Sequence, residues 1–294
     1  MLKGRLGLES ARIPHADRHG LMWLGRGSLS VEDGTLRFAT AGSPDLPPGD
    51  YAIPFQAVSC FLLEPGTTVS HDALRLLSRH GCCLVAVGEG GVRLYASLPA
   101  GPSVSARARR HAELWADPSA RMQVARRMYA MRFGEIPGTT NLDVLRGIEG
   151  ARVKEIYKQL ASRYGLTWYA RKYDRGQPDQ ADLPNQAINH ASSALQAAAL
   201  TAIAITGALP QLGFIHEDPG HAFALDLSDL FRESVMLPAA FLAVRTKEVL
   251  KDEEKLERLV RQKMGEAIRK DKVIPAMIDR IKELIDADDG GGDE

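Results

Sequence analysis

The sequence predicts an α+β protein in which a small β-rich domain with one helix precedes an all-α domain. Short apolar runs separated by turn residues fill the first hundred residues, as strands do. Pro99–Pro102 is a break typical of a linker, and after it apolar residues recur at the i, i+3 and i+4 spacing of helices. We therefore expect domains over residues 1–100 and 101–285, followed by a frayed acidic tail over 286–294.

Turn and capping residues define the elements of the first domain. Asp33-Gly34 between two apolar runs predicts a hairpin. Ser70 can cap a helix over Asp72–His80, which Gly81 ends. The expected strands are Leu21–Leu24, Ser28–Val31, Thr35–Ala39, Tyr51–Ile53, Ala57–Leu63, Cys82–Val87 and Val92–Ala96.

Seven segments beyond the break have helical spacing, and a polar loop over Tyr173–Pro184 interrupts them. The expected helices are Arg107–Trp115, Ala120–Phe133, Leu142–Tyr164, Asn185–Thr206, Asp229–Val249, Glu253–Arg269 and Val273–Ala287.

Net charge is the least informative property of this chain until it is resolved by region. The 294 residues carry 37 basic and 37 acidic side chains, and a net charge of zero argues against a nucleic-acid protein. Residues 101–176, however, hold 15 basic and 7 acidic residues, and residues 177–294 hold 13 and 21. The net charge of zero is therefore the sum of +8 and −8 in two regions. The alternative interpretation is that these charge runs are only solvated helical faces.

The three cysteines cannot all pair, and Cys82–Cys83 lies in an apolar run, so we expect reduced thiols and a cytoplasmic protein. The most apolar stretch, Ala194–Leu209, is too short and too polar to span a membrane.

Glu149 is the first candidate for chemistry. It falls on the apolar stripe of Leu142–Tyr164, where a charge is costly unless it is paired or binds a metal. Gly147 and Gly150 flank it and would let a backbone or ligand approach. A structural carboxylate paired with Arg146 or Arg152 is the alternative.

His216 and two aspartates form the second candidate set. His216 and His221 are five residues apart with Pro219-Gly220 between them, which excludes a helical HExxH zinc motif. His216 could therefore be a satisfied core histidine. Asp226 and Asp229 would share a helical face, or could cap a helix start. Together with Glu149 they make an oxygen and imidazole set that suits Mg²⁺ or Mn²⁺ better than structural zinc.

Three motifs resemble the CRISPR-associated adaptation endonuclease family (Cas-one), the integrase subunit that inserts new spacers. They are Leu145–Val153, Gly213–His216 and Phe223–Asp229, and Leu63–Thr67, Val69–His71 and Gly88–Ser97 resemble its type I-E branch. The similarity covers nearly the whole chain except the acidic tail.

The resemblance implies a β-sandwich-like N-terminal domain, a helical catalytic domain, and one divalent metal bound by Glu149, His216 and Asp229, with Asp226 beside the site. It also implies a homodimer, two of which clasp a dimer of the smaller partner Cas-two and bind prespacer DNA. Arg26 and Gln196 replace aromatic residues of some relatives, which leaves open how the DNA fork is splayed. The expected DNA contacts are Arg75, Arg93, Arg146, Arg152, Arg163, Arg171 and Lys172.

Two other functions remain compatible with these residues. One is a metal-dependent nuclease that acts on branched DNA without integration. The other is a DNA-binding scaffold without activity, in which the carboxylates form structural ion pairs.

Overall fold

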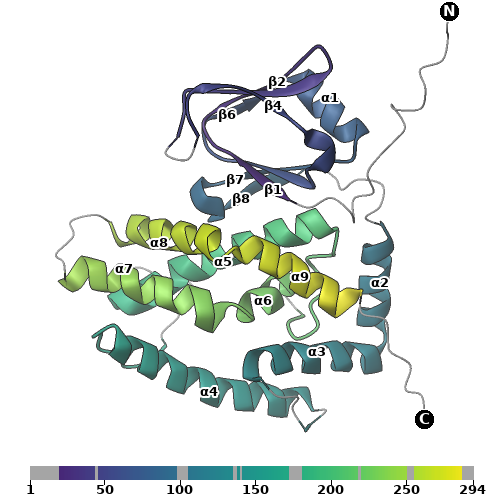
Figure 1. The fold of residues 1–294 in the computed structure, drawn as a ribbon. Helices are drawn as coiled ribbons and strands as arrows, with labels where there is room; N and C mark the ends of the chain where they lie inside the picture. Colours follow the sequence, from purple (N-terminus) through teal and green to yellow (C-terminus); the bar gives the residue numbers. More distant parts are fainter. Residues whose placement is uncertain are drawn as a thin grey trace, which may run out of the picture. The chain divides into compact units, whose positions relative to one another are not determined.

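A computed structural model describes residues 20–43, 46–97, 105–134, 138–139, 141–171, 181–217, 220–249 and 255–286. The chain forms two compact units (Figure 1), one over Met1–Glu89 with Leu94–Ser105 and one over Gly90–Arg93 with Ala106–Glu294. The linker at Pro99–Pro102, the last eight residues of the acidic tail and Lys172 lie outside the described residues. The predicted α+β class, β-rich and then helical, is confirmed.

The first unit contains two four-stranded sheets and one helix. One sheet has the order β1-β5-β7-β8, from β1 (Leu21–Leu24), β5 (Cys60–Leu63), β7 (Cys83–Val87) and β8 (Leu94–Ser97). The other has the order β4-β3-β2-β6, from β4 (Gly49–Ile53), β3 (Thr35–Thr40), β2 (Gly27–Glu32) and β6 (Thr67–Val69). Strands β1, β5 and β7 pair in parallel, whereas β2, β3 and β4 pair antiparallel.

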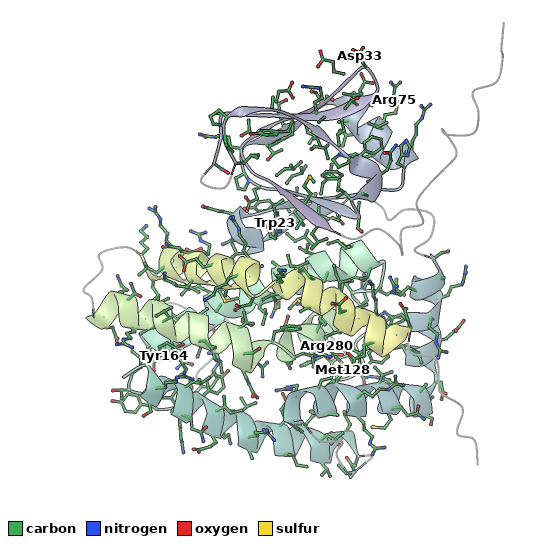
Figure 2. All side chains as sticks on the ribbon, viewed as in Figure 1. Trp23, Asp33, Arg75, Met128, Tyr164 and Arg280 are labelled. Carbon is green, nitrogen blue, oxygen red and sulfur yellow. The ribbon has the colours of Figure 1, made fainter. Side chains whose placement is uncertain are left out.

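Local residue chemistry explains the turns of this unit. Asp33 and Gly34 have φ of 49° and 75°, the positive values that a tight two-residue hairpin requires, and Asp33 lies at the tip of the hairpin (Figure 2). Helix α1 (His71–Arg79) begins where the Ser70 hydroxyl accepts the Ala73 amide. Both features confirm the sequence prediction.

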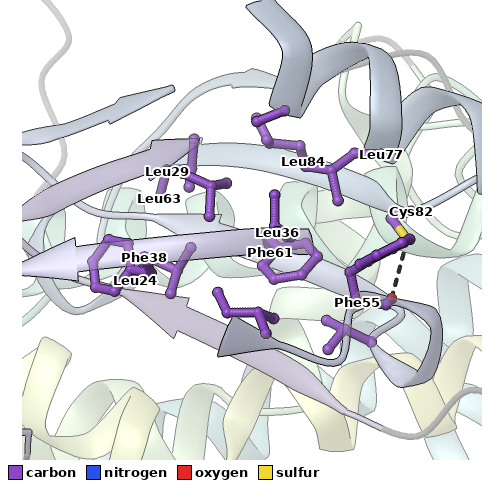
Figure 3. Packing of buried hydrophobic residues seen from close by; sticks show 13 residues of the cluster. Leu24, Leu29, Leu36, Phe38, Phe55, Phe61, Leu63, Leu77, Cys82 and Leu84 are labelled. Carbon is purple, nitrogen blue, oxygen red and sulfur yellow. Dashed lines mark hydrogen bonds between the residues drawn. The ribbon is translucent and has the colours of Figure 1, made fainter. Parts of the chain in front are cut away.

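The core of this unit is a cluster of buried aliphatic and aromatic side chains from both sheets and α1 (Figure 3). Leu29, Leu36, Phe61 and Leu77 have no exposed surface. The thiol of Cys82 donates a hydrogen bond to the Phe55 carbonyl at 3.3 Å. Cys60, Cys82 and Cys83 are buried and form no disulfide, in agreement with their apolar sequence context.

The second unit is helical, and its longest helix is its packing centre. Helix α5 (Leu183–Thr206) packs against α6, α7, α8 and α9. Its alanine-rich sequence allows close packing, and fifteen of its residues are buried. The other helices are α2 (Ser105–Ala116), α3 (Pro118–Phe133), α4 (Leu142–Arg163), α6 (Ala222–Asp229), α7 (Leu237–Val249), α8 (Leu256–Lys270) and α9 (Val273–Ile285).

Three expectations about the elements were wrong. Strand β6 was not predicted, and Phe55–Ala57 forms a 3-10 turn, so that β5 begins only at Cys60. Where a single helix was expected over Asp229–Val249, α6 ends at Asp229, and a π-helical turn η5 (Arg232–Met236) precedes α7. Pro238 lies in the first turn of α7, where its missing amide is tolerated, and for the same reason it cannot donate the i to i−4 hydrogen bond of a continuous α-helix.

No helix among the described residues combines the length and the apolar composition that crossing a bilayer requires.

Candidate metal and nucleic-acid site

Glu149 lies on the inward face of α4, as the stripe predicted, with 15% of its side chain exposed. The helix begins at Asn141, whose side-chain oxygen accepts the amides of Asp143 and Val144. Glu149 Oε1 lies 2.6 Å from Arg132 Nη1, and its Oε2 accepts the Tyr129 hydroxyl at 3.1 Å. The structure thus gives Glu149 partners on α3 rather than the expected Arg146 or Arg152.

Helix α6 buries two aspartates. Asp226 and Asp229 retain 1% and 8% exposure, and Asp226 lies within the helix. Asp226 Oδ2 accepts the amides of Phe214 and Ile215 at 2.6 and 3.0 Å, and its Oδ1 accepts the His216 amide at 3.0 Å. The capping role considered for Asp226 is therefore wrong, because its carboxylate binds a neighbouring loop instead of the first turn of a helix.

The same Asp226 Oδ1 lies 2.6 Å from His216 Nδ1, which leaves Nε2 of the ring for another ligand. His216 is 37% exposed and is not the satisfied core histidine that was one interpretation. Its hydrogen bond with Asp226 raises the pKa of His216 against the opposing effect of burial, and the charges of Asp226, Asp229 and Glu149 add to the rise.

Two arginines that the sequence analysis missed neutralise the carboxylates. Arg132, 2% exposed, lies 2.6 Å from Glu149 and 4.0 Å from Asp229 Oδ2. Arg232 pairs with Asp229 and lies 3.8 Å from Glu149 Oε1. Burial raises the pKa of the Asp229 carboxyl, and the two arginines oppose this rise. Burial also raises the pKa of the Tyr129 hydroxyl, with a further contribution from the Glu149 charge.

A signal for Arg132 was present in the sequence. Ala125, Met128 and Tyr129 are buried on one face of α3, and Arg132 follows on that stripe, seven residues after Ala125. It is a charge among apolar positions of α3, as Glu149 is among those of α4. Met128, labelled in Figure 2, marks this stretch of the helix. A cation on one apolar stripe and a carboxylate on another indicate that the two charges pair with each other once the helices pack.

The chemistry of the donors fits a hard divalent cation, since two carboxylates share one cationic neighbour and an imidazole nitrogen is available. Nε and Nη2 of Arg132 are buried and have no hydrogen-bond partner among the described residues. The described part of the chain does not, however, group three His, Cys, Asp or Glu side chains closely enough to hold a metal ion. Glu149 and Asp229 pair with the arginines, His216 pairs with Asp226, and in the described structure the three predicted ligands do not form an assembled coordination sphere.

A cavity of about 570 Å³ opens beside α4 within the helical unit. Gly150, Lys154 and Lys158 line it from α4, and Arg232 links it to the carboxylates. Aromatic rings lie along it, and those of Tyr157 and Trp168 are stacked with their centroids 4.9 Å apart. Cationic and aromatic side chains around one cavity are suited to a nucleic-acid strand.

The predicted DNA contacts fall into two groups. Arg163 and Arg152 are exposed, and Arg152 lies over the Phe133 ring at 5.0 Å. The guanidinium groups of the others are engaged: Arg75, labelled in Figure 2, pairs with Asp72, Arg93 with Glu257, and Arg171 with Asn185 and Asn189, whereas Arg146 binds Asp143 and the Ile215 carbonyl. Of the two departures, Arg26 lies between β1 and β2, and Gln196 is part of α5.

Comparisons with known proteins bear on this constellation. The sequence profile of the family described as CRISPR associated protein Cas1 matches residues 129–271. The CRISPR-associated endonuclease Cas1 of Geobacter sulfurreducens is 39% identical over 96% of this chain and 88% of its own. That of Escherichia coli is 36% identical over 94% and 87%, respectively.

Solved structures agree in fold. A TtCas1–DNA complex superposes with a TM-score of 0.81 at 34% identity, and the match covers 92% of this chain and 97% of that one. A casposase bound to its integration product has a TM-score of 0.62 at 16% identity, over 91% and 96%, which is a likeness of fold alone. Matches of this identity and extent show that the chain belongs to the family of CRISPR-associated Cas1 endonucleases.

Proposed function

We propose that this chain is a divalent-metal-dependent DNA endonuclease and integrase that joins the 3′-hydroxyl of a prespacer to a CRISPR repeat by transesterification. The observation that carries the proposal is the arrangement around Arg132, where Glu149 and Asp229 share one cation. Beside them, Asp226 binds Nδ1 of His216 and leaves Nε2 for a ligand. These groups come from separate elements and converge on one place. A scaffold stabilised by simple ion pairs would not need such an arrangement.

Glu149, Asp229 and Nε2 of His216 would hold Mg²⁺ or Mn²⁺. Bound there, the cation would polarise a phosphoryl oxygen and favour attack by the 3′-hydroxyl on the scissile phosphate. It would also replace the neutralisation of the carboxylates that Arg132 and Arg232 provide in this structure.

The remaining groups position and neutralise. Asp226 accepts Nδ1–H of His216, which fixes the ring orientation and the tautomer in which Nε2 is a ligand. Both carboxylate oxygens of Asp226 accept from the His216 loop and the residue is 1% exposed, so we assign it a positioning role. Arg232 contacts the carboxylates and lines the cavity, where it can meet the phosphates of a strand that enters there.

DNA is the partner that this site favours. The net charge of +8 over residues 101–176 surrounds Glu149 and would neutralise phosphates without reading bases. The family and the TtCas1–DNA complex support DNA as the partner, and we propose prespacer and repeat DNA as the substrates. By the same family logic we propose a homodimer that assembles with Cas-two, and we propose the cytoplasm, where free thiols such as Cys60 persist.

The test is strand transfer of a prespacer oligonucleotide into repeat DNA, with purified Cas-two, in Mn²⁺ and in chelator. We expect Glu149→Gln to lower strand transfer by at least a hundredfold while DNA binding in chelator changes little. Glutamine keeps the shape of the side chain and an oxygen that can accept from Arg132 or Tyr129, but it lacks the charge that holds a metal. Glu266→Gln is the matched control, since Glu266 is exposed and pairs only locally with Lys263. Undiminished joining by Glu149→Gln would exclude the proposed site.

A nuclease that acts on branched DNA would use the same ligands. It differs in that branched DNA would be cleaved in Mn²⁺ without Cas-two or a repeat. A scaffold would bind DNA equally with and without chelator and catalyse neither reaction.

A further inference from the structure

The loop that carries His216 has an unusual pattern of backbone contacts. Residues 212–216 form neither helix nor strand, yet side chains of three helices bind four successive carbonyls. His111 and Trp115 of α2 hold the carbonyls of Leu212 at 2.8 Å and Gly213 at 3.0 Å. On the other helices, Arg121 of α3 holds Phe214 O at 3.2 Å, and Arg146 of α4 holds Ile215 O at 2.7 Å.

The amides of this loop are bound as well. Those of Phe214, Ile215 and His216 all donate to the Asp226 carboxylate. Gly213 closes the loop so tightly that an added Cβ would lie 2.3 Å from the His216 carbonyl oxygen and 2.8 Å from the Ala222 Cβ. Both the carbonyls and the amides of the loop are therefore fixed, so that the loss of one contact should shift the position of the His216 ring.

Among the four carbonyl-binding side chains, Arg146 differs in where it comes from. It lies three residues before Glu149 on the same helix, whereas the carbonyl that it binds belongs to the residue before His216. One side chain thereby connects the elements of two proposed metal ligands. Its other terminal nitrogen lies 3.3 Å from Asp143, so both ends of the guanidinium are directed by the protein.

We propose that Arg146 is a positioning residue, which sets the separation of Glu149 and His216 by clamping the Ile215 carbonyl to α4. This deepens the proposed function and rests on it. A phosphate contact, the role first expected for Arg146, would need the guanidinium to leave the loop.

Two properties separate the roles. Loss of a phosphate contact weakens DNA binding and lowers its salt dependence by about one unit of slope, and lysine largely replaces it. Loss of a clamp weakens metal binding, typically tenfold to a hundredfold for a group that orients a ligand. Lysine does not replace the clamp, because it has no planar fork to reach Asp143 and Ile215 together.

The experiment compares Arg146→Gln and Arg146→Lys with the wild type in the full-length chain. Arg280→Gln is the matched control, because Arg280 (labelled in Figure 2) has the same 46% side-chain exposure and a similar local ion pair, with Glu283. Mn²⁺ binding is titrated by electron paramagnetic resonance, and DNA binding is measured in chelator as a function of salt. The expected result is an Mn²⁺ dissociation constant at least tenfold higher in both Arg146 variants, with an unchanged DNA salt slope and an unaffected control.

A third readout separates failure of this inference from failure of the proposed function. The Nδ1–H signal of His216 in the NMR spectrum of metal-free protein, assigned with His216→Gln, should broaden in both Arg146 variants. A wild type that binds no Mn²⁺ would sink the proposed function, and the NMR signal would still decide the clamp. Unchanged His216 signals, or DNA binding lost in Arg146→Gln and restored in Arg146→Lys, would overturn the inference.

Discussion

Single buried polar residues determine how this site is held. His111 of α2 has no exposed surface, and its ring stacks on Phe214 with centroids 5.1 Å apart. Its Nδ1 accepts the Leu209 amide, while its Nε2 binds the Leu212 carbonyl. This pattern requires a neutral ring that carries its proton on Nε2. Burial accordingly lowers the pKa of His111 from 6.5 to about 4.

The shift predicts a pH-dependent stability. Below pH 6.5 the unfolded chain takes up a proton that the folded chain refuses until about pH 4. The contribution of His111 to the free energy of unfolding should therefore be fully present above pH 6.5. It should fall as the pH drops, by about 2 kcal/mol between pH 7 and pH 5. Denaturant unfolding at the two pH values measures it. His111→Gln should lose this part of the pH dependence, and a variant of exposed His71 should keep it.

The residue scale also shows what the sequence could and could not predict. Glu149 and the shared face of Asp226 and Asp229 were recognisable, because a charge among apolar spacings stands out in the chain itself. The position of Arg132 on its own apolar stripe was visible as well, but its pairing with Glu149 was not, and Arg232 carried no signal. Both arginines approach Glu149 only after α3, α4 and η5 have packed together. The role of Asp226 depends on a loop ten residues earlier, and no spacing rule relates them.

At the scale of elements, the two glycines of α4 make a matched pair. An added Cβ at Gly147 or Gly150 would meet nothing within 4 Å, so packing in the described structure requires neither glycine. Only Gly150 lines the cavity. The sequence analysis explained both glycines by the approach of a ligand, and the structure supports this reasoning for Gly150 alone.

Alanine substitutions at Gly147 and Gly150 should distinguish an effect on helix stability from an effect on the approach of a ligand. Both Gly147→Ala and Gly150→Ala should raise the free energy of unfolding by up to about 1 kcal/mol, because alanine favours the helix. Gly150→Ala alone should weaken DNA binding, measured by fluorescence anisotropy. Equal DNA affinities for the two variants would show that no strand passes Gly150.

The elements themselves were largely predictable where capping and periodicity agree. Asn141, Ser70 and the glycine at 34 define boundaries by local chemistry that tertiary contacts do not alter. Prediction failed at Asp229–Val249, where apolar spacing continues through η5 although the backbone hydrogen-bonding pattern changes. A π-helical turn beside a functional site is a recurring association, and here it carries Arg232 to the carboxylates.

For the whole molecule, the distribution of charge matters more than its sum. A chain with zero net charge has no overall attraction for DNA, so binding must come from the basic region. We expect the logarithm of the DNA association constant to fall linearly with the logarithm of salt concentration, with a slope of about 0.9 per neutralised phosphate. Lys154→Gln, in the cavity, should reduce this slope by about one unit, whereas Lys282→Gln on α9 should not.

The loop before His216 has one more consequence, for exchange with solvent. Backbone outside helices and strands ordinarily trades its amide hydrogens for deuterium within seconds, because nothing holds them. The amides of Phe214, Ile215 and His216 are instead held by a carboxylate that is itself 1% exposed. In deuterated water this irregular segment should keep its protons as long as the neighbouring helices do, and it should release them only when α6 opens.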